Sequence, residues 1–186
     1  MPVFNSRLRL EDFESAALPH LDDIYRTAVH PLRDANEAED LAQDVYLQAW
    51  KSFDRFQPGT NCRAWLFQIL FHRLHHHRRK WFPMRFMERD EHVLENAAPY
   101  EPPVPEELTD KEVLAALEKV PQDFREVLLL TDVHELSYKE AAAALGIPVG
   151  TVMSRLSRGR KALRNQLSGY AQSFGLKNAK AEGESE

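Results

Sequence analysis

The sequence predicts an all-α protein of two small helical domains joined by an extended linker. Apolar residues recur at helical spacing in its longer segments, and no stretch alternates with the two-residue period of a half-buried strand. The segment 97–107, AAPYEPPVPEE, contains four prolines and three acids, so it cannot form a helix and offers little to bury. We therefore expect a domain at residues 12–95, a Pro-rich linker at 96–108, a second domain at 109–170 and a disordered charged tail at 171–186.

Three amphipathic helices are predicted before the linker. The first covers residues 13–29 and is ended by Pro31. The second covers residues 37–53 after a cap-like start at Asn36, and the third covers residues 63–80 after the turn at Pro58 and Gly59. The predicted inner face of the second helix is Ala38, Leu41, Ala42, Val45, Ala49 and Phe53. That of the third is Leu66, Ile69, Leu70 and Leu74.

The second domain begins with a clear helix start. Thr109 and Glu112 have the spacing of a capping box, which predicts a helix that runs to Lys119. Pro121 interrupts the chain, and Phe124 opens a further helix. These two helices would support the segment that follows them.

Residues 137–167 have the pattern of a helix-turn-helix. Ser137 and Glu140 form a second capping box, and Gly146 and Pro148 end the short helix that it starts. The next helix has one apolar stripe at helical spacing: Val152, Leu156, Gly159, Leu163 and Leu167. Its other positions are polar or basic, and no acid occurs between residues 149 and 167. A short helix supported by another, with a cationic outer face, is typical of a recognition helix in the major groove of DNA.

The net charge of −5 conceals separate basic and acidic segments. Basic residues concentrate at 73–89 and 155–164, and acids at 37–44, 88–112 and 182–186. Since DNA responds to the local field, the basic segments are compatible with nucleic-acid binding, and the acidic ones suggest a second, protein partner.

Several classes of protein are excluded by what the sequence lacks. No apolar run approaches the ~20 residues that span a bilayer, and the start MPVFNSRLRLEDF lacks the apolar core of a signal peptide. We therefore expect a cytoplasmic protein without membrane insertion. Cys62 is the only cysteine, which rules out an internal disulfide. No Ser/His/Asp set, Walker-type loop or carboxylate pair indicates catalysis, so we expect neither enzymatic activity nor a cofactor.

The polar side of the third helix combines basic side chains, imidazoles and aromatic residues. It carries Gln68, His72, His75, His76 and Arg79, followed by Lys80, Trp81 and Phe82. Such a mixture suits single-stranded nucleic acid, whose unpaired bases need surfaces on which to stack.

Two other interpretations fit parts of this pattern. The cluster from His72 to His77 could bind zinc, because imidazoles four residues apart share a helix face, but no HExxH motif or carboxylate at ligand spacing accompanies it. A helix-turn-helix repressor or activator that binds duplex operator DNA would explain the second domain. It would not explain the acidic helix or the basic and aromatic patch of the first.

Two long segments together resemble a known family. AEDLAQDVYLQAWKSFDRFQPGTNCRAWLFQIL and VPQDFREVLLLTDVHELSYKEAAAALGIPVGTVMSRLSRGRKALR are similar to the extracytoplasmic-function sigma factors of the sigma-70 family, in the same order and spacing. The ending YAQSFGL resembles the group that responds to thiol oxidation through a zinc-containing anti-sigma factor.

The resemblance implies partners for each domain. In the family, the first domain, sigma region 2, docks on the β′ clamp helices of core RNA polymerase and melts and recognises the −10 element. The second, region 4, recognises the −35 element next to the β subunit. The resemblance also implies an anti-sigma factor as a partner, and a monomer when the chain is free of partners.

Site residues are carried over position by position. The polymerase-docking residues would be Asp40, Gln43 and Asp44. Those for the −10 element would be Asn61, Trp65, Gln68, His72, His75, His76, Arg79 and Lys80. Those for the −35 element would be Thr151, Met153, Ser154, Arg155, Ser157, Arg158, Arg160 and Lys161. Arg155 and Lys161 are expected to contact phosphates, which sets affinity and not sequence preference.

Overall fold

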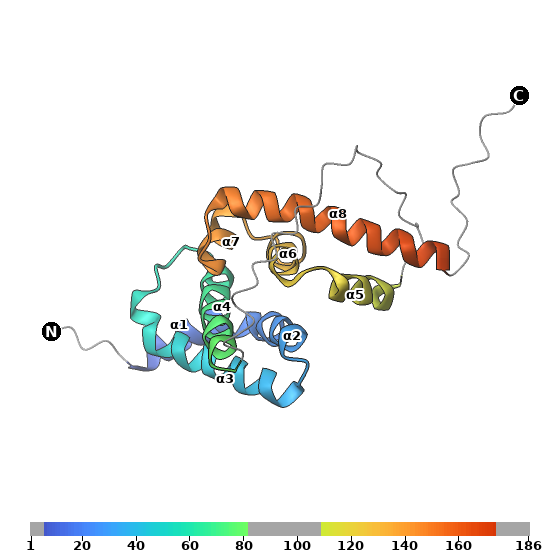
Figure 1. The fold of residues 1–186 in the computed structure, drawn as a ribbon. Helices are drawn as coiled ribbons and strands as arrows, with labels where there is room; N and C mark the ends of the chain where they lie inside the picture. The colour runs from blue at the N-terminus through green and yellow to red at the C-terminus, as the bar shows by residue number, and fades with distance from the viewer. Residues whose placement is uncertain (1–5, 82–108, 174–186) are drawn as a thin grey trace, which may run out of the picture. The chain divides into compact units, whose positions relative to one another are not determined.

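The predicted all-α fold class is confirmed. The computed structural model describes residues 6–81 and 109–173, and no strand occurs within those ranges (Figure 1). The chain divides into two compact units, residues 1–90 with 136–148 and residues 91–135 with 149–186. The predicted linker lies outside the described residues, as does the predicted tail beyond residue 173.

The first predicted helix is wrong in its bounds, because it consists of three elements. They are α1 (Ser6–Ala17), the 3-10 turn η1 (Leu18–His20) and α2 (Leu21–Leu32). Pro19 lies at the start of η1 and has no N–H with which to continue α1. Pro31 lies inside the last turn of α2 and does not end it. The helix ends instead at Arg33, which adopts a left-handed φ of 57° and donates its N–H to the carbonyl of Val29.

Helix α3 (Ala35–Ser52) begins earlier than predicted, because Asp34 caps it in place of Asn36. The Asp34 carboxylate accepts from the N–H groups of Asn36, at 2.8 Å, and Glu37, at 3.1 Å. The predicted inner face is confirmed at five positions, whereas Phe53 is half-buried in the 3-10 turn η2 (Phe53–Arg55) that follows.

An aromatic cluster joins α1 to the C-terminal half of α3. The buried ring of Phe13 meets the rings of Trp50 and Phe53 edge-on, with centroids 5.3 and 5.2 Å away. Arg9 lies 4.6 Å over the Trp50 ring and donates to the Trp50 carbonyl. Tyr46 donates its hydroxyl to the carbonyl of Ala17, and burial raises the pKa of that phenol.

Helix α4 (Cys62–Trp81) runs through the middle of the first unit and packs on α2, α3 and α7 (Tyr138–Leu145) (Figure 1). Three of its four predicted inner residues are buried, while Ile69 is half-buried. The rings of Phe67 and Phe71 are also buried. This packing leaves the opposite side of α4 exposed at Gln68 and His72.

Both predicted capping boxes are present. Glu112 caps α5 (Asp110–Lys119) with Thr109, and Glu140 caps α7 with Ser137. Gly146 then ends α7 with a φ of +67°, a conformation that glycine adopts without a Cβ penalty.

In the second unit, α8 (Val149–Ser173) packs on α5 and α6 (Gln122–Leu128). Gly159 permits a close approach to α6, since a Cβ there would lie 3.1 Å from Leu128 Cδ1 and 3.2 Å from Phe124 Cβ. After α6 the chain forms a π-helical turn, η3 (Leu129–Val133), which was not predicted from the sequence.

Candidate nucleic-acid interface

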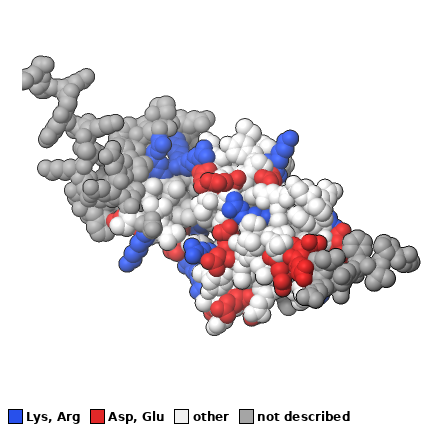
Figure 2. Space-filling view, turned by 180° about the vertical axis from the view of Figure 1, so that it is seen from behind, with Lys and Arg blue, Asp and Glu red and all other residues white. Residues whose placement is uncertain are grey.

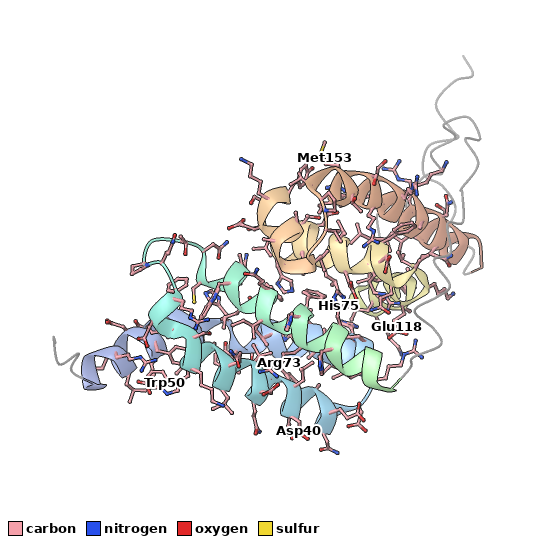
Figure 3. The ribbon with its side chains drawn as sticks, turned by 60° about the vertical axis from the view of Figure 1, so that its left-hand side comes forward. Asp40, Trp50, Arg73, His75, Glu118 and Met153 are labelled. Atoms are coloured by element: carbon pink, nitrogen blue, oxygen red, sulfur yellow. The ribbon has the colours of Figure 1, made fainter. Side chains whose placement is uncertain are left out.

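The outer face of α8 is exposed because its apolar stripe packs inward. Val152, Leu156, Gly159 and Leu167 are buried. Met153 is 53% exposed and projects from the N-terminal part of the helix (Figure 3). The other exposed candidates on α8 are Ser154, Ser157, Arg158, Arg160 and Lys161, while Thr151 and Arg155 are half-exposed. The eight predicted residues therefore lie outside the stripe, as a recognition helix requires.

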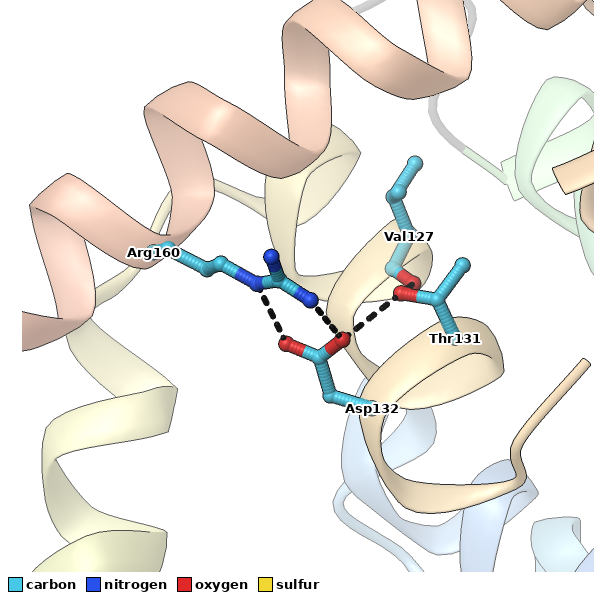
Figure 4. Close-up of polar contacts among 4 residues, drawn as sticks. All are labelled: Val127, Thr131, Asp132 and Arg160. Atoms are coloured by element: carbon cyan, nitrogen blue, oxygen red, sulfur yellow. Dashed lines mark hydrogen bonds and ion pairs between the residues drawn. The ribbon is translucent and has the colours of Figure 1, made fainter.

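Two acids from the preceding elements contact this basic helix. Asp123 of α6 lies 2.6 Å from the guanidinium of Arg155. Asp132 of η3 accepts from Arg160 Nε at 3.0 Å and from Nη2 at 2.7 Å (Figure 4). Hydrogen bonds from Arg160 are the main reason that the pKa of Asp132 lies below its usual value. Neither acid was predicted from the sequence, because both lie outside the recognition helix.

Charge also varies over short distances elsewhere on the surface. On the face drawn in Figure 2, Lys and Arg side chains lie beside Asp and Glu side chains. The net charge of −5 is therefore a poor guide to the field at any one site.

The loop before α4 is ordered by aromatic stacking and short hydrogen bonds. Phe56 stacks on Phe53 with an interplanar angle of 11°, and its centroid lies 5.1 Å from that of Trp65. The side-chain oxygen Oδ1 of Asn61 accepts from the N–H of Ala64 at 3.2 Å and so caps α4. Trp65 is thus both part of this stack and half-exposed.

Three predicted −10 residues line one hollow in the first unit. Its volume is about 310 Å³, and its lining consists of Asn61, Trp65 and Gln68 with Arg55, Phe56, Gln57, Thr60, Ala64, Glu140 and Ala143. The pKa of Glu140 lies below its usual value, chiefly because the Ser137 hydroxyl donates to it, with a smaller effect of a hydrogen bond from Asn61. An aromatic wall with amide groups beside it is suited to an unstacked base.

The remaining −10 candidates follow the hollow along α4. His72 and His76 are exposed, whereas His75 is half-buried, with its ring centroid 6.2 Å from that of Phe71 (Figure 3). The side chains of Arg79 and Lys80 lie outside the described residues, as does the ending that resembles the thiol-oxidation group.

The acidic candidates on α3 differ in their surroundings. Asp40 and Gln43 are exposed, and Asp40 points away from α4 (Figure 3). Asp44 instead forms an ion pair of 3.3 Å with Arg73 of α4, and Arg73 also donates to the Gln48 side chain at 2.8 Å. Asp44 therefore has a structural partner as well as an exposed edge.

Leu47 lies on the same face of α3 and was not predicted from the sequence. Its side chain is 51% exposed, and it follows Asp40, Gln43 and Asp44 by seven, four and three residues. This spacing, together with the absence of Leu47 from the inner stripe of α3, could have identified Leu47 from the sequence. The α3 face thus combines carboxylates and an amide with one large apolar side chain.

The described side chains give no support to a zinc site. Among them, no group of three His, Cys, Asp or Glu is placed to hold a metal ion, although the side chain of His77 is not described. Cys62 is half-buried at the start of α4, and burial raises the pKa of its thiol. None of the helices in the described ranges combines the length and the apolar character needed to cross a bilayer.

Two family models match the chain, one in each predicted domain. Sigma-70 region 2 matches residues 17–81, and Sigma-70, region 4 matches residues 110–163.

Curated relatives extend this similarity over most of the chain. It is 37% identical over 169 residues to the ECF RNA polymerase sigma factor EcfG of Rhodopseudomonas palustris, which covers 88% of this chain and 86% of the relative. It is 33% identical over 157 residues to the ECF RNA polymerase sigma factor SigE of Mycolicibacterium smegmatis. That match covers 82% of this chain but 60% of the longer relative.

Solved structures are similar over the same extent. The sigma factor RpoE of Bartonella quintana, determined in complex with the anti-sigma factor NepR, has a TM-score of 0.65 and 32% identity, and the match covers 84% of this chain and 97% of that one. CnrH, determined in complex with the cytosolic domain of CnrY, has a TM-score of 0.60 and 25% identity, with coverages of 86% and 90%.

Proposed function

The chain belongs to the extracytoplasmic-function sigma factors of the sigma-70 family, and from this premise we propose a division of labour among its surfaces. Helix α3 binds core RNA polymerase, the start of α4 opens and recognises the −10 element, and α8 recognises the −35 element. The observation that carries this proposal is that one chain contains both region 2 and region 4 in family order, each with its own exposed polar helix face.

Docking on the polymerase is assigned to the exposed face of α3. Asp40, Gln43 and the exposed edge of Asp44 would pair with basic and polar groups of the β′ clamp helices. Leu47 would supply the apolar centre that such a contact needs, since charged groups around a desolvated apolar residue are typical of protein interfaces.

Promoter melting is assigned to the hollow at the start of α4. Unstacking a base costs a few kcal/mol, which stacking and pocket contacts to the extruded base offset. The tilted pair of Phe56 and Trp65 offers an aromatic surface, and Asn61 and Gln68 offer amide groups that can hydrogen-bond to a base edge. His72, His76, Arg79 and Lys80 would then contact the strand beside it.

Recognition of the −35 element is assigned to the exposed residues of α8. Arg158 can form a bidentate pair with guanine, which contributes about 1–3 kcal/mol of discrimination. Lys161 and Arg155 suit phosphate contacts, although Arg155 also pairs with Asp123.

A protein inhibitor is the third expected partner. RpoE of Bartonella quintana is similar to this chain over most of its length and is bound by the anti-sigma factor NepR. We expect this chain to be held by a comparable anti-sigma protein and to be a monomer otherwise. As a factor for core polymerase it would act in the cytoplasm, as a regulator of transcription and not as an enzyme.

The family assignment favours this function over an operator-binding repressor or activator, which needs no region 2. The two functions also differ in the behaviour of the purified protein. A sigma factor binds its promoter weakly until it joins the polymerase, whereas a repressor binds duplex DNA tightly by itself.

Binding to sigma-free core polymerase, followed by run-off transcription from a promoter library, tests the proposal. Co-elution and promoter-dependent transcripts are expected, with Asp40→Arg impairing core binding and Arg158→Ala impairing promoter selection. Asp22→Arg and Arg26→Ala are matched controls, because they remove exposed charges from α2. Tight duplex binding without any association with core polymerase would refute the proposal.

A further inference from the structure

Arg160 of α8 is held more firmly than a surface arginine usually is. Two of its nitrogens, Nε and Nη2, donate to the two carboxylate oxygens of Asp132 (Figure 4). This paired contact fixes the plane of the guanidinium as well as its position. The side chain of Arg160 nevertheless remains 58% exposed, so the fixed guanidinium is presented at the surface.

The fold places Asp132 for this contact through the π-helical turn η3. The N–H of His134 donates to the carbonyl of Leu129, five residues earlier, at 2.9 Å. Leu129 and Leu130 are buried and anchor the turn. Thr131 donates its hydroxyl to the carbonyl of Val127 at 2.9 Å. The Thr131 hydroxyl oxygen also lies 3.2 Å from Asp132 Oδ1. The Asp132 carboxylate therefore projects from a turn that is held by hydrogen bonds and by two buried side chains.

Arg160 is one of the predicted −35 residues that are exposed on α8. It follows Met153 by seven residues and Ser157 by three, so the three side chains share one side of the helix. Arginine is the usual partner of guanine in the major groove, where it donates to O6 and N7. An arginine whose orientation is set before binding loses less side-chain entropy when it makes that contact.

We propose that Asp132 is a positioning residue for promoter recognition, which orients Arg160 so that its guanidinium recognises a guanine of the −35 element. This inference rests on the proposed function of α8. It adds a residue outside the recognition helix to the determinants of sequence preference. The contact of Arg155 with Asp123 differs, because one guanidinium nitrogen meets an acid that is itself 63% exposed.

The test measures base preference with the assembled holoenzyme. Run-off transcription from a library randomised across the −35 element is sequenced for the unaltered chain first. Its failure to transcribe, or to prefer any −35 base, would refute the proposed function of α8 and not the role of Asp132 within it. With a preference established, Arg160→Ala is expected to abolish the preference for guanine at one position.

Asp132→Asn is expected to weaken that same preference roughly 3- to 10-fold, the factor expected from freeing one rotamer-rich side chain. The base preference at the other positions of the −35 element should be unaffected. Asp132→Glu, which retains the carboxylate, should keep most of the preference. The double variant Asp132→Asn/Arg160→Ala should be no worse than Arg160→Ala alone. Asp123→Asn is the matched control, and it should leave the preference at this position intact.

Three results would overturn the inference. One is an unchanged preference in Asp132→Asn where Arg160→Ala has lost it, since Arg160 would then need no positioning. Another is a loss of transcription in Asp132→Asn that is equal for every −35 base, which would indicate a phosphate contact or a structural role. The third is an effect of Asp132→Asn that persists in the Arg160→Ala background. Thermal unfolding and core binding of each variant separate these results from misfolding, and Asp132→Glu keeps the test open if the amide variant is unstable.

Discussion

The ion pair between Asp44 and Arg73 allows the polymerase-docking role of α3 to be separated from its structural role. The two groups lie 3.3 Å apart, and their side chains are 45% and 36% exposed. Because solvent screens a pair this exposed, it is expected to stabilise the first unit by about 0.2–1 kcal/mol. Asp44→Arg removes that contribution and adds a repulsion of similar size, for a total of about 0.4–2 kcal/mol.

This loss is measurable by thermal unfolding, since a domain of this size changes its Tm by about 4–8 °C per kcal/mol. The charge-swapped variant Asp44→Arg/Arg73→Asp restores an ion pair of opposite polarity, so most of the lost Tm should return. Gln48 can adapt by turning its amide to donate to the new carboxylate. Asp40→Arg should leave the Tm unchanged, because Asp40 is exposed and away from α4.

Core binding should follow a different pattern. We expect Asp40→Arg, Asp44→Arg and the charge-swapped variant all to weaken binding to sigma-free core polymerase by about 10-fold or more, since each places a cation where an acid docks. Recovery of both Tm and core binding in the charge-swapped variant would refute the docking role of Asp44 and leave it a purely structural residue. An unchanged Tm in Asp44→Arg would refute the structural part of the argument.

Three further predictions follow from the packing and the titrating groups. Gly159→Val should lower the free energy of unfolding by about 1–3 kcal/mol in chemical denaturation, because its Cβ would lie 3.1 Å from Leu128, whereas Gly150→Ala meets no atom within 4 Å and should be neutral or stabilising. The pKa of Asp132 is lowered in the folded state. The ionised carboxylate therefore stabilises the fold fully above the unfolded-state pKa of about 4, and this stabilisation is lost as the pH falls through the folded-state pKa. Acid titration should therefore cost the unaltered chain more stability below that pH than it costs Asp132→Asn, and parallel curves would contradict this. Burial raises the pKa of the Cys62 thiol, so alkylation at neutral pH should be slower in the folded protein than in urea, and equal rates would show that the thiol is accessible.

Local chemistry in the sequence determined the helix starts and stops that were predicted correctly. The capping boxes at Thr109 and Ser137 join residues three apart, and Gly146 adopts its left-handed conformation at the end of α7 because it lacks a Cβ. The inner stripes of α3 and α8 were also predictable, since helical spacing alone decides which residues share a face. The errors near Pro19, Pro31 and Asp34 arose where several plausible caps and breakers compete within a few residues.

Tertiary structure decided which candidate site residues are held in ion pairs. Asp132 meets Arg160 across 28 residues, and Asp44 meets Arg73 across 29 residues, so neither pair has a signal in local spacing. The π-helical turn that aims Asp132 depends on the burial of Leu129 and Leu130, which is a property of the packed unit. The sequence by itself determined which faces are polar, because hydrophobic periodicity is local. Which charges on those faces are already paired was decided by helix packing, because an ion pair forms between whichever groups the folded chain brings within about 4 Å.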